Sequence, residues 1–263
     1  MIEMIDIHTH ILPGIDDGAD SIETSTLMAH DAVSGGTEVV VATPHILPGG
    51  ALIGPDMIQS HVRDLGREIS RKGIYLKLLP GAEIAIDIDL LSRLKSGEYC
   101  TIGGASRYVL IELPFQDIPI YSQHVIFSLA SAGYVPIIAH PERNARIMSD
   151  PGSFYEFFQS GALGQVSAGS ITGEFGPHAR RAAEFLIESR LVQIIASDGH
   201  NARTRRCRLD RAWAVAARLV GRELAREMVE GIPRAVIENS EVDRGEVRLH
   251  RHRRLFSFGW GRG

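Results

Sequence analysis

Seven short β-rich runs alternate with longer helical stretches along the chain, and this alternation constrains the fold more than any other feature. The runs are predicted strands, at residues 4–10, 38–45, 74–84, 108–113, 135–140, 163–167 and 191–198. Helical patterns are predicted at 21–34, 55–72, 120–132, 151–160, 177–189 and 210–230. Such alternation is typical of an α/β protein with a largely parallel sheet.

Several runs are apolar throughout, which indicates strands buried on both faces. Val39–Ala42 and Ile194–Ala196 are examples. A closed barrel or an open doubly wound sheet satisfies this pattern. A dinucleotide-binding open sheet would need a glycine-rich turn after its first strand, but Gly14 and Gly18 have the wrong spacing. We therefore favour a barrel that forms a single domain over residues 1–240, followed by a tail over 241–263.

Charge is distributed unevenly between the two ends of the chain. Residues 1–62 contain nine acids, five histidines and no Lys or Arg. This block attracts cations and disfavours nucleic acid, although it also fits a solvated acidic face. Residues 244–263 hold six Arg, two His and one Glu among Phe, Trp and Gly. That tail fits a disordered solubilising segment, or one that binds anionic polysaccharide intermediates, membrane lipid or a kinase.

The first residues lack the basic start of a signal peptide, and no apolar run approaches the roughly 18 residues of a spanning helix. The two cysteines, Cys100 and Cys207, suit a reducing compartment and provide no disulfide framework. We expect a cytoplasmic protein. The sequence does not specify an oligomeric state.

Metal-compatible side chains stand at the ends of six of the seven predicted strands. They are His8 with His10, His45, Glu83, Glu112, His140, and Asp198 with His200. A single His or Glu at a strand end is usually structural, but the repetition is hard to attribute to chance. Because active sites gather at the carboxyl ends of barrel strands, we expect these residues to meet there.

The spacing of the first motif supports shared ligation. A side-chain period of two places Asp6, His8 and His10 on one face of a strand, so that both imidazoles reach one ion. Asp198 and His200 have the same spacing, and Gly199 between them permits a sharp exit from the strand. Nitrogen and carboxylate ligands without thiolate favour Mn, Fe, Zn or Mg, and the many carboxylates permit a multinuclear cluster.

Further candidates lie just beyond these strand ends. Either Asp16 or Asp17 is a candidate ligand, although both also suit a turn before a helix. Arg143 follows His140 by three residues, and a planar guanidinium beside metals suits a phosphate oxyanion. Arg203, Arg205 and Arg206 follow Asp198 at similar range, so that one of them is a second candidate. Surface salt bridges are the competing interpretation.

Other catalytic chemistries lack their motifs. A thiol phosphatase needs Cys-x5-Arg, but Arg107 follows Cys100 one position too late, and Trp213 stands where Cys207 would need Arg. Neither a nucleophile-elbow serine nor a Walker A sequence is present. Four histidines within predicted helices are expected to be structural: His30, His61, His124 and His178. Metal-assisted hydrolysis is the leading class.

Six ordered motifs between residues 1 and 239 resemble those of the PHP (polymerase and histidinol phosphatase) superfamily. They are Asp6–Gly18 (DIHTHILPGIDDG), Ala42–His45 (ATPH), Pro80–Glu83 (PGAE), Leu110–Glu112 (LIE), Ile138–Arg143 (IAHPER) and Ile195–Asn201 (IASDGHN). Within the superfamily they are most similar to the bacterial metal-dependent protein-tyrosine phosphatases of capsule and exopolysaccharide operons. The segment 165–172 matches only in part, and the tail after residue 241 lies outside the resemblance.

The resemblance implies a distorted (β/α)7 barrel with a trinuclear centre, most often of Mn²⁺, with Fe, Mg, Co or Zn as alternatives. It implies three ligand sets, of which the first two share Glu83. The first metal takes His8, His10, Glu83 and Asp198, the second Glu83, Glu112 and His140, and the third Asp17, His45 and His200. Arg143 and Arg205 match the family's phosphate-binding arginines.

The implied substrate is a phosphorylated tyrosine autokinase that controls polysaccharide export. The resemblance also allows peripheral association of this protein with the membrane complex of that kinase. A hydroxide shared by two metals would attack phosphorus, and phenolate, whose conjugate acid has a pKa of about 10, would leave readily. One alternative is a small-molecule phosphoesterase such as a histidinol phosphatase, because fold inference does not fix a substrate. Another is a non-catalytic regulator that binds a kinase tail.

Overall fold

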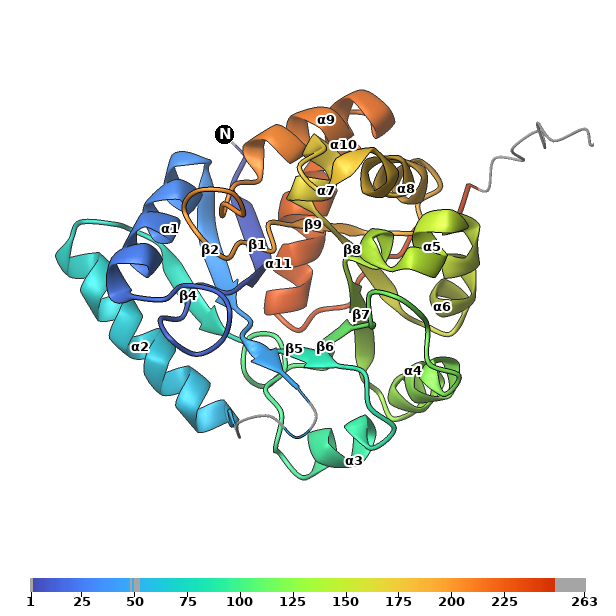
Figure 1. The fold of residues 1–263 in the computed structure, drawn as a ribbon, viewed down its shortest axis with the longest axis horizontal. Helices are drawn as coiled ribbons and strands as arrows, with labels where there is room; N and C mark the ends of the chain where they lie inside the picture. The colour runs from blue at the N-terminus through green and yellow to red at the C-terminus, as the bar shows by residue number, and fades with distance from the viewer. Residues whose placement is uncertain (1, 48, 50–52, 249–263) are drawn as a thin grey trace, which may run out of the picture.

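Parallel strands form the inner layer of the structure, and helices surround them (Figure 1). The computed structural model describes residues 2–47, 49 and 53–248. The strands are β1 (Met4–Thr9), β2 (Thr37–Ala42), β3 (His45–Ile46), β4 (Lys77–Pro80), β5 (Glu83–Ala85), β6 (Tyr108–Glu112), β7 (Val135–Ala139), β8 (Leu163–Ser167) and β9 (Ile194–Ala196). Each strand pairing within the described sheets is parallel, as predicted.

Backbone hydrogen bonds close these strands into a ring. The two sheets have the orders β1-β2-β4 and β3-β5-β6-β7-β8-β9, and β3 and β5 continue the chain paths of β2 and β4. On the other side, Asp198 N donates to His8 O at 2.9 Å and His10 N donates to Gly199 O at 2.8 Å, joining β9 to β1. The ring has one member for each of the seven predicted runs. The predicted single-domain α/β class is confirmed.

Alternate residues along the strands enter two separate hydrophobic clusters. In β6, Tyr108 and Leu110 join the cluster inside the ring, whereas Val109 and Ile111 join the larger cluster beneath the helices. Ile137 and Ile138 divide in the same way in β7. Both faces of the sheet are therefore buried, which accounts for the apolar runs of the sequence.

The helices confirm the longer predictions and add short elements. They are α1 (Ile22–Ser34), α2 (Pro55–Arg71), α3 (Leu90–Lys95), α4 (Ser122–Ser131), α5 (Ala145–Ser149), α6 (Tyr155–Gln159), α7 (Ala168–Thr172), α8 (Gly176–Glu188), α9 (Asp210–Val220), α10 (Arg222–Arg226) and α11 (Ile232–Ile237). The single helix predicted over 210–230 is wrong, because Gly221, at φ 91° and ψ 156°, interrupts it. A π-helical turn, Glu227–Gly231, connects α10 to α11.

The end of the ring at which the strands begin is covered by α11 and the chain that follows it. Ile232, Ile237 and Val242 pack against the cluster inside the ring. Arg234 forms a 3.0 Å ion pair with Glu3, just before β1. Beyond residue 240, Arg244 Nη1 donates to Phe158 O at 2.6 Å, so that the described start of the proposed tail lies against the barrel.

The rest of the proposed tail, residues 249–263, lies outside the described residues. Within the described chain, none of the helices has the length and apolar character needed to cross a lipid bilayer.

Candidate metal centre

The nine candidate ligands converge at the carboxyl ends of the strands. They come from six strands of the ring: His8 and His10 lie at the end of β1, His45 begins β3, Glu83 begins β5, Glu112 ends β6, His140 follows β7, and Asp198 and His200 follow β9. Asp17 joins them from the loop between β1 and α1. All except Asp17, Glu112 and His45 are buried.

The pairing of β1 with β2 contains a register shift beside the two histidines. Asp6 pairs with Val40 and Thr9 with Ala42, so β1 has one extra residue between these pairs. Bulges of this kind redirect side chains beside active sites. As predicted, both imidazoles reach one ligand group, whereas Asp6 is not part of it and its carboxylate accepts backbone hydrogen bonds from His8 N and Ser197 N.

The ligand atoms fall into four overlapping groups within 4.8 Å of one another. The groups are His8, His10 and Asp198; His8, Glu83 and His140; His45, Glu83 and Glu112; and His10, Asp17, His45 and His200. Glu83 occupies the middle of the centre, because its Oε2 lies 3.2 Å from His8 Nε2, 3.3 Å from His10 Nε2 and 3.0 Å from His45 Nδ1. Ligands about 2.1 Å from one ion lie roughly 3–3.5 Å apart, so these spacings suit ions between them.

The hydrogen bonds of three histidines fix which ring nitrogen is available. The Nδ1 groups of His8, His10 and His200 donate to Gln165 Oε1 at 2.8 Å, Asp16 Oδ2 at 2.7 Å and Asp198 O at 3.0 Å. In their neutral forms these imidazoles therefore present Nε2 lone pairs, and the Nε2 atoms of His8 and His10 lie only 3.1 Å apart. Two facing lone pairs need a cation between them. Hydrogen-bond acceptors at Nδ1 are also typical of metal-bound histidines, because they orient the imidazole.

Buried polar atoms without hydrogen-bond partners support the same fit. Glu83 Oε2, His45 Nδ1 and His200 Nε2 are all buried, and none of them forms a hydrogen bond with a described residue. Unpartnered polar atoms are costly in a protein interior. Divalent ions would satisfy them, so the donor set fits a metal cluster.

The pKa values of the histidines depend on which neighbours each has in the centre. Burial opposes the charge of His10, but its hydrogen bond with Asp16 and the negative charges of Asp16 and Glu83 outweigh this and raise the His10 pKa to about 10. Burial and the neighbouring His10 lower the pKa of His200 to about 3, which keeps that imidazole neutral. Protons and metal ions therefore compete for the same nitrogen atoms.

Asp16 contacts the centre from behind its histidines. Besides His10, it accepts hydrogen bonds from His45 N at 2.9 Å and Gly18 N at 3.0 Å. The loop passes so close to β1 that a Cβ on Gly18 would overlap the carbonyl oxygen of His10. Of the two acids considered in the sequence, Asp17 is the one whose carboxylate faces the ligand group, 3.5 Å from His45 and 3.4 Å from His200.

Both candidate phosphate-binding arginines are attached to one ligand. Arg143 Nη1 and Arg205 Nη2 each lie 2.7 Å from a different carboxylate oxygen of Asp198. The Arg143 guanidinium also lies between two aromatic rings, 4.8 Å from Phe115 and 4.5 Å from Phe175. Stacking and hydrogen bonding together restrict its orientation.

Two ligands have unusual backbone conformations. His140 has φ 32° and Asp198 has φ 52°, in the left-handed region that side chains other than glycine rarely adopt. Such strain concentrates at functional sites. The sharp exit after β9 was expected at Gly199, but Asp198 makes it, while Gly199 is required because a Cβ there would overlap Cys207 Sγ.

Sequence reasoning did not assign roles to Gln165, Phe115 or Phe175, which orient a ligand or an arginine. A buried amide in the middle of the apolar run of β8 was the available signal for Gln165. The helical histidines His30, His61, His124 and His178 belong to none of the four groups.

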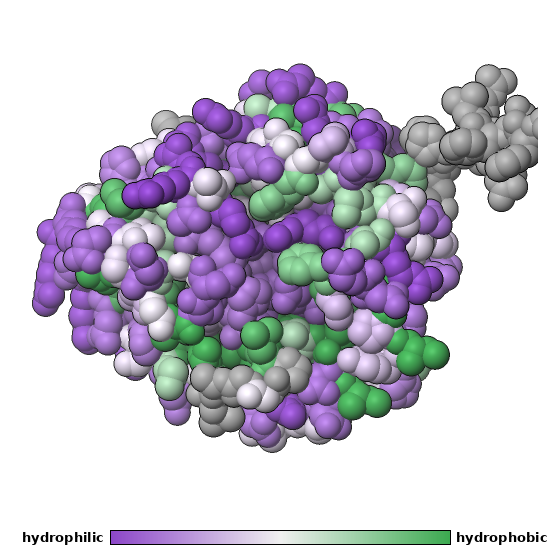
Figure 2. Space-filling model, in the orientation of Figure 1, coloured by the Kyte–Doolittle hydropathy of each residue, from purple (hydrophilic) through white to green (hydrophobic). Residues whose placement is uncertain are grey.

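Figure 2 shows this face of the molecule with a hollow at its centre lined by hydrophilic residues. Hydrophobic residues gather along its lower border in that view. Of the candidate ligands, Asp17 is 66% exposed, so the centre is reached from solvent on the side of Asp17.

Known proteins are similar to this chain in sequence and in fold. The family model described as "Capsular polysaccharide synthesis, CpsB/CapC" matches residues 4–238. The tyrosine-protein phosphatase YwqE of Bacillus subtilis is 34% identical, with 97% of this chain and 100% of that protein covered. The tyrosine-protein phosphatase CpsB of Streptococcus pneumoniae is 28% identical, with 89% and 98% covered.

A solved structure from a study of YwqE and CpsB, described as unique metal-dependent tyrosine phosphatases, superposes with a TM-score of 0.88. It is 33% identical and covers 94% of this chain and all of that one. A lactonase from Listeria monocytogenes, 13% identical at a TM-score of 0.55 over 91% of this chain and 96% of its own, shares the fold alone. The resemblance inferred from the six motifs is confirmed, and the chain belongs to the CpsB/CapC family of capsular polysaccharide synthesis.

Proposed function

We propose that this protein is a metal-dependent phosphatase that hydrolyses phosphotyrosine on a tyrosine autokinase of polysaccharide synthesis, in the cytoplasm. The observation that carries the proposal is the joining of the ligand groups to Arg143 and Arg205 through Asp198. The relatives YwqE and CpsB, named as tyrosine-protein phosphatases, support the substrate class.

Three divalent ions would be held by the ligand sets that the family resemblance implies. The first set is His8, His10, Glu83 and Asp198, the second Glu83, Glu112 and His140, and the third Asp17, His45 and His200. These sets overlap the four groups of neighbouring ligand atoms without matching them one to one. When bound, such ions lower the pKa of coordinated water and neutralise phosphoryl oxygens. Nitrogen and carboxylate donors without thiolate suit Mn²⁺, with Fe, Mg, Co or Zn as alternatives.

Arg143 and Arg205 would bind and orient the phosphoryl group. Their guanidinium groups are held at the edge of the centre by Asp198, and each retains N–H donors outside that contact. Donors fixed before the reaction stabilise charge that develops on phosphoryl oxygens in the transition state.

Phenolate departure makes little demand on the protein, because the conjugate acid of a tyrosyl oxygen has a pKa of about 10. The aromatic substrate suits the mouth of the centre, where Phe115 is 43% exposed beside Arg143. The rings of Phe115 and Phe175 would contact the substrate ring and hold it near the two arginines.

The test is hydrolysis by enzyme reconstituted with Mn²⁺, compared with metal-depleted enzyme, on a phosphotyrosine peptide and on histidinol phosphate. We expect metal-dependent turnover that favours the peptide. Preference for histidinol phosphate would indicate a small-molecule phosphoesterase, and binding of a kinase tail without turnover would indicate a regulator. Undiminished turnover after metal removal would overturn the metal mechanism.

A further inference from the structure

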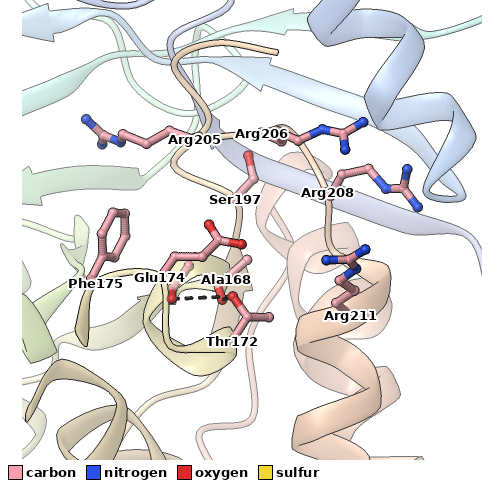
Figure 3. Close-up of a pocket in the computed structure, with 10 residues that line it drawn as sticks. Ala168, Thr172, Glu174, Phe175, Ser197, Arg205, Arg206, Arg208 and Arg211 are labelled. Carbon is pink, nitrogen blue, oxygen red and sulfur yellow. Dashed lines mark hydrogen bonds between the residues drawn. The ribbon is translucent and has the colours of Figure 1, made fainter. Parts of the chain in front are cut away.

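Beside the metal centre lies a small pocket lined by arginines (Figure 3). Arg205, Arg206 and Arg208 come from the segment between β9 and α9, and Arg211 from the first turn of α9. The opposite wall includes Glu174 and Phe175, which follow α7. The pocket encloses ≈ 60 Å³, which suits a group the size of a carboxylate rather than a whole cofactor.

The pocket shares two side chains with the surroundings of the proposed phosphate site. Arg205 lines it and also contacts Asp198 at 2.7 Å. Phe175 lines it and stacks on the guanidinium of Arg143 at 4.5 Å. In Figure 3, Arg205 extends toward Phe175, whereas Arg206 extends in the opposite direction. A peptide whose phosphotyrosine occupies the centre would therefore reach the pocket with a nearby residue, since each extended residue spans about 3.3–3.6 Å.

Two of the arginines are fixed by neighbouring acids. Arg206 donates to Asp31 through Nε and Nη2, and Arg208 donates to Asp210 through the same two groups. These salt bridges leave the Nη1 group of each guanidinium outside the pair. Because their orientations are already restricted, less side-chain entropy would be lost when an anion binds.

Arg211 provides charge that the described structure does not neutralise. It is exposed and forms no salt bridge with a described carboxylate. Glu174 is the acidic side chain that lines the pocket, and it is also exposed. The pocket is thus lined by four guanidinium groups and one carboxylate. Three of the guanidinium groups are paired with acids outside the lining, and the N–H donors that the four groups retain favour an incoming anion.

We propose that this pocket is a subsite for an acidic side chain of the substrate peptide, a few residues from the phosphotyrosine. The inference rests on the proposed function and deepens it, because it makes the enzyme selective for phosphotyrosine in an acidic sequence. Arg211 is the specificity determinant, and Glu174 limits the affinity of the subsite.

The experiment uses a set of phosphotyrosine peptides, each with a single Asp at one of the two positions before or the two positions after the phosphotyrosine. Each peptide is compared with the same peptide carrying Asn at that position. At one or more positions we expect the wild type to prefer Asp by about fivefold in kcat/KM, the scale of one partly exposed ion pair. Arg211→Gln should remove that preference without changing turnover of free phosphotyrosine. Glu174→Gln should increase it.

Arg218→Gln is the matched control, because Arg218 is an exposed arginine two turns further along α9 and does not line the pocket. It should retain the Asp preference. Equal turnover of Asp and Asn peptides by the wild type, with free phosphotyrosine still hydrolysed, would overturn the subsite alone. Failure to hydrolyse any phosphotyrosine substrate would overturn the proposed function. In that case, the binding of Asp and Asn peptides that carry a non-hydrolysable phosphonate in place of the phosphate tests the subsite. Tighter binding of the Asp peptide by the wild type, lost in Arg211→Gln, supports the subsite. Equal affinities of the wild type for the Asp and Asn peptides overturn it.

Discussion

The Nη1 group of Arg143 lies 2.7 Å from Oδ2 of Asp198, so the proposed phosphate-binding arginine is anchored on a proposed metal ligand. Its guanidinium is also stacked between Phe115 and Phe175. We expect Arg143→Lys to lower kcat for phosphotyrosine by about 10²–10³-fold, because an ammonium group can neither stack in the same plane nor donate from two edges. Steady-state kinetics with Mn²⁺ measure this.

Arg146→Gln provides the control for that substitution. Arg146 is a surface residue that pairs with Asp117 at 3.1 Å, and both side chains are exposed. Its removal should leave kcat unchanged. Wild-type activity in Arg143→Lys would show that charge alone is sufficient at this position.

Asp16 should control metal affinity without binding an ion itself. Burial raises its pKa, but the hydrogen bonds from His10, His45 N and Gly18 N outweigh this and lower the pKa to about 2, so it is ionised at neutral pH. Asp16→Asn should weaken Mn²⁺ binding by about 10–100-fold. Activity should recover at high Mn²⁺. Titration of activity against free Mn²⁺ tests this, with the exposed Asp20 changed to Asn as the control, and identical titration curves would contradict it.

Asp17 tests whether the third ion binds separately. Its carboxylate lies 3.5 Å from His45 and 3.4 Å from His200 and its side chain is 66% exposed, so its removal should leave the buried groups intact. We expect Asp17→Ala to bind one ion fewer than the wild type. Elemental analysis after gel filtration measures the ratio of metal to protein, and an unchanged ratio would count against a ligand role.

Metal removal should destabilise the folded protein as well as inactivate it. Ions that bind only the folded state stabilise it by about 2.7 kcal/mol per site at a concentration 100 times their Kd. The Tm should therefore fall on chelation and rise again with added Mn²⁺. A Tm that is independent of Mn²⁺ would contradict occupation of the buried ligand groups.

Thiol reagents should leave activity unchanged. Cys100 and Cys207 are both 1% exposed, and burial raises the pKa of Cys100 to about 12 and that of Cys207 well above its usual value. The thiolate is the reactive form, so alkylation of the native protein should be slow. Inactivation by iodoacetamide in proportion to labelling would point to a cysteine-dependent reaction.

The order of strands and the convergence of candidate ligands were predictable from the sequence. Both depend on local properties, since apolar runs mark buried strands and polar residues at their ends mark one edge of the ring. His45 and Glu112 show this, because His45 begins β3 and Glu112 ends β6, and the strands of both lie beside that of Glu83.

Features set by tertiary contacts were not predictable in this way. The extra residue between Asp6 and Thr9 is recognisable only from the pairing of β1 with β2. Phe175 stacks on Arg143 from a loop more than thirty residues further along the chain, so no sequence spacing reveals the contact. The break at Gly221 depends on a backbone conformation that glycine permits but does not require.

The bonds that join β9 to β1 also set the order in which this centre can be assembled. His8 and His10 are synthesised almost two hundred residues before their partner Asp198. A growing chain therefore carries unpaired imidazoles and carboxylates until the last strand arrives. Binding of the first ion would then require a closed ring. A truncated chain that lacks β9 would be unable to retain that ion.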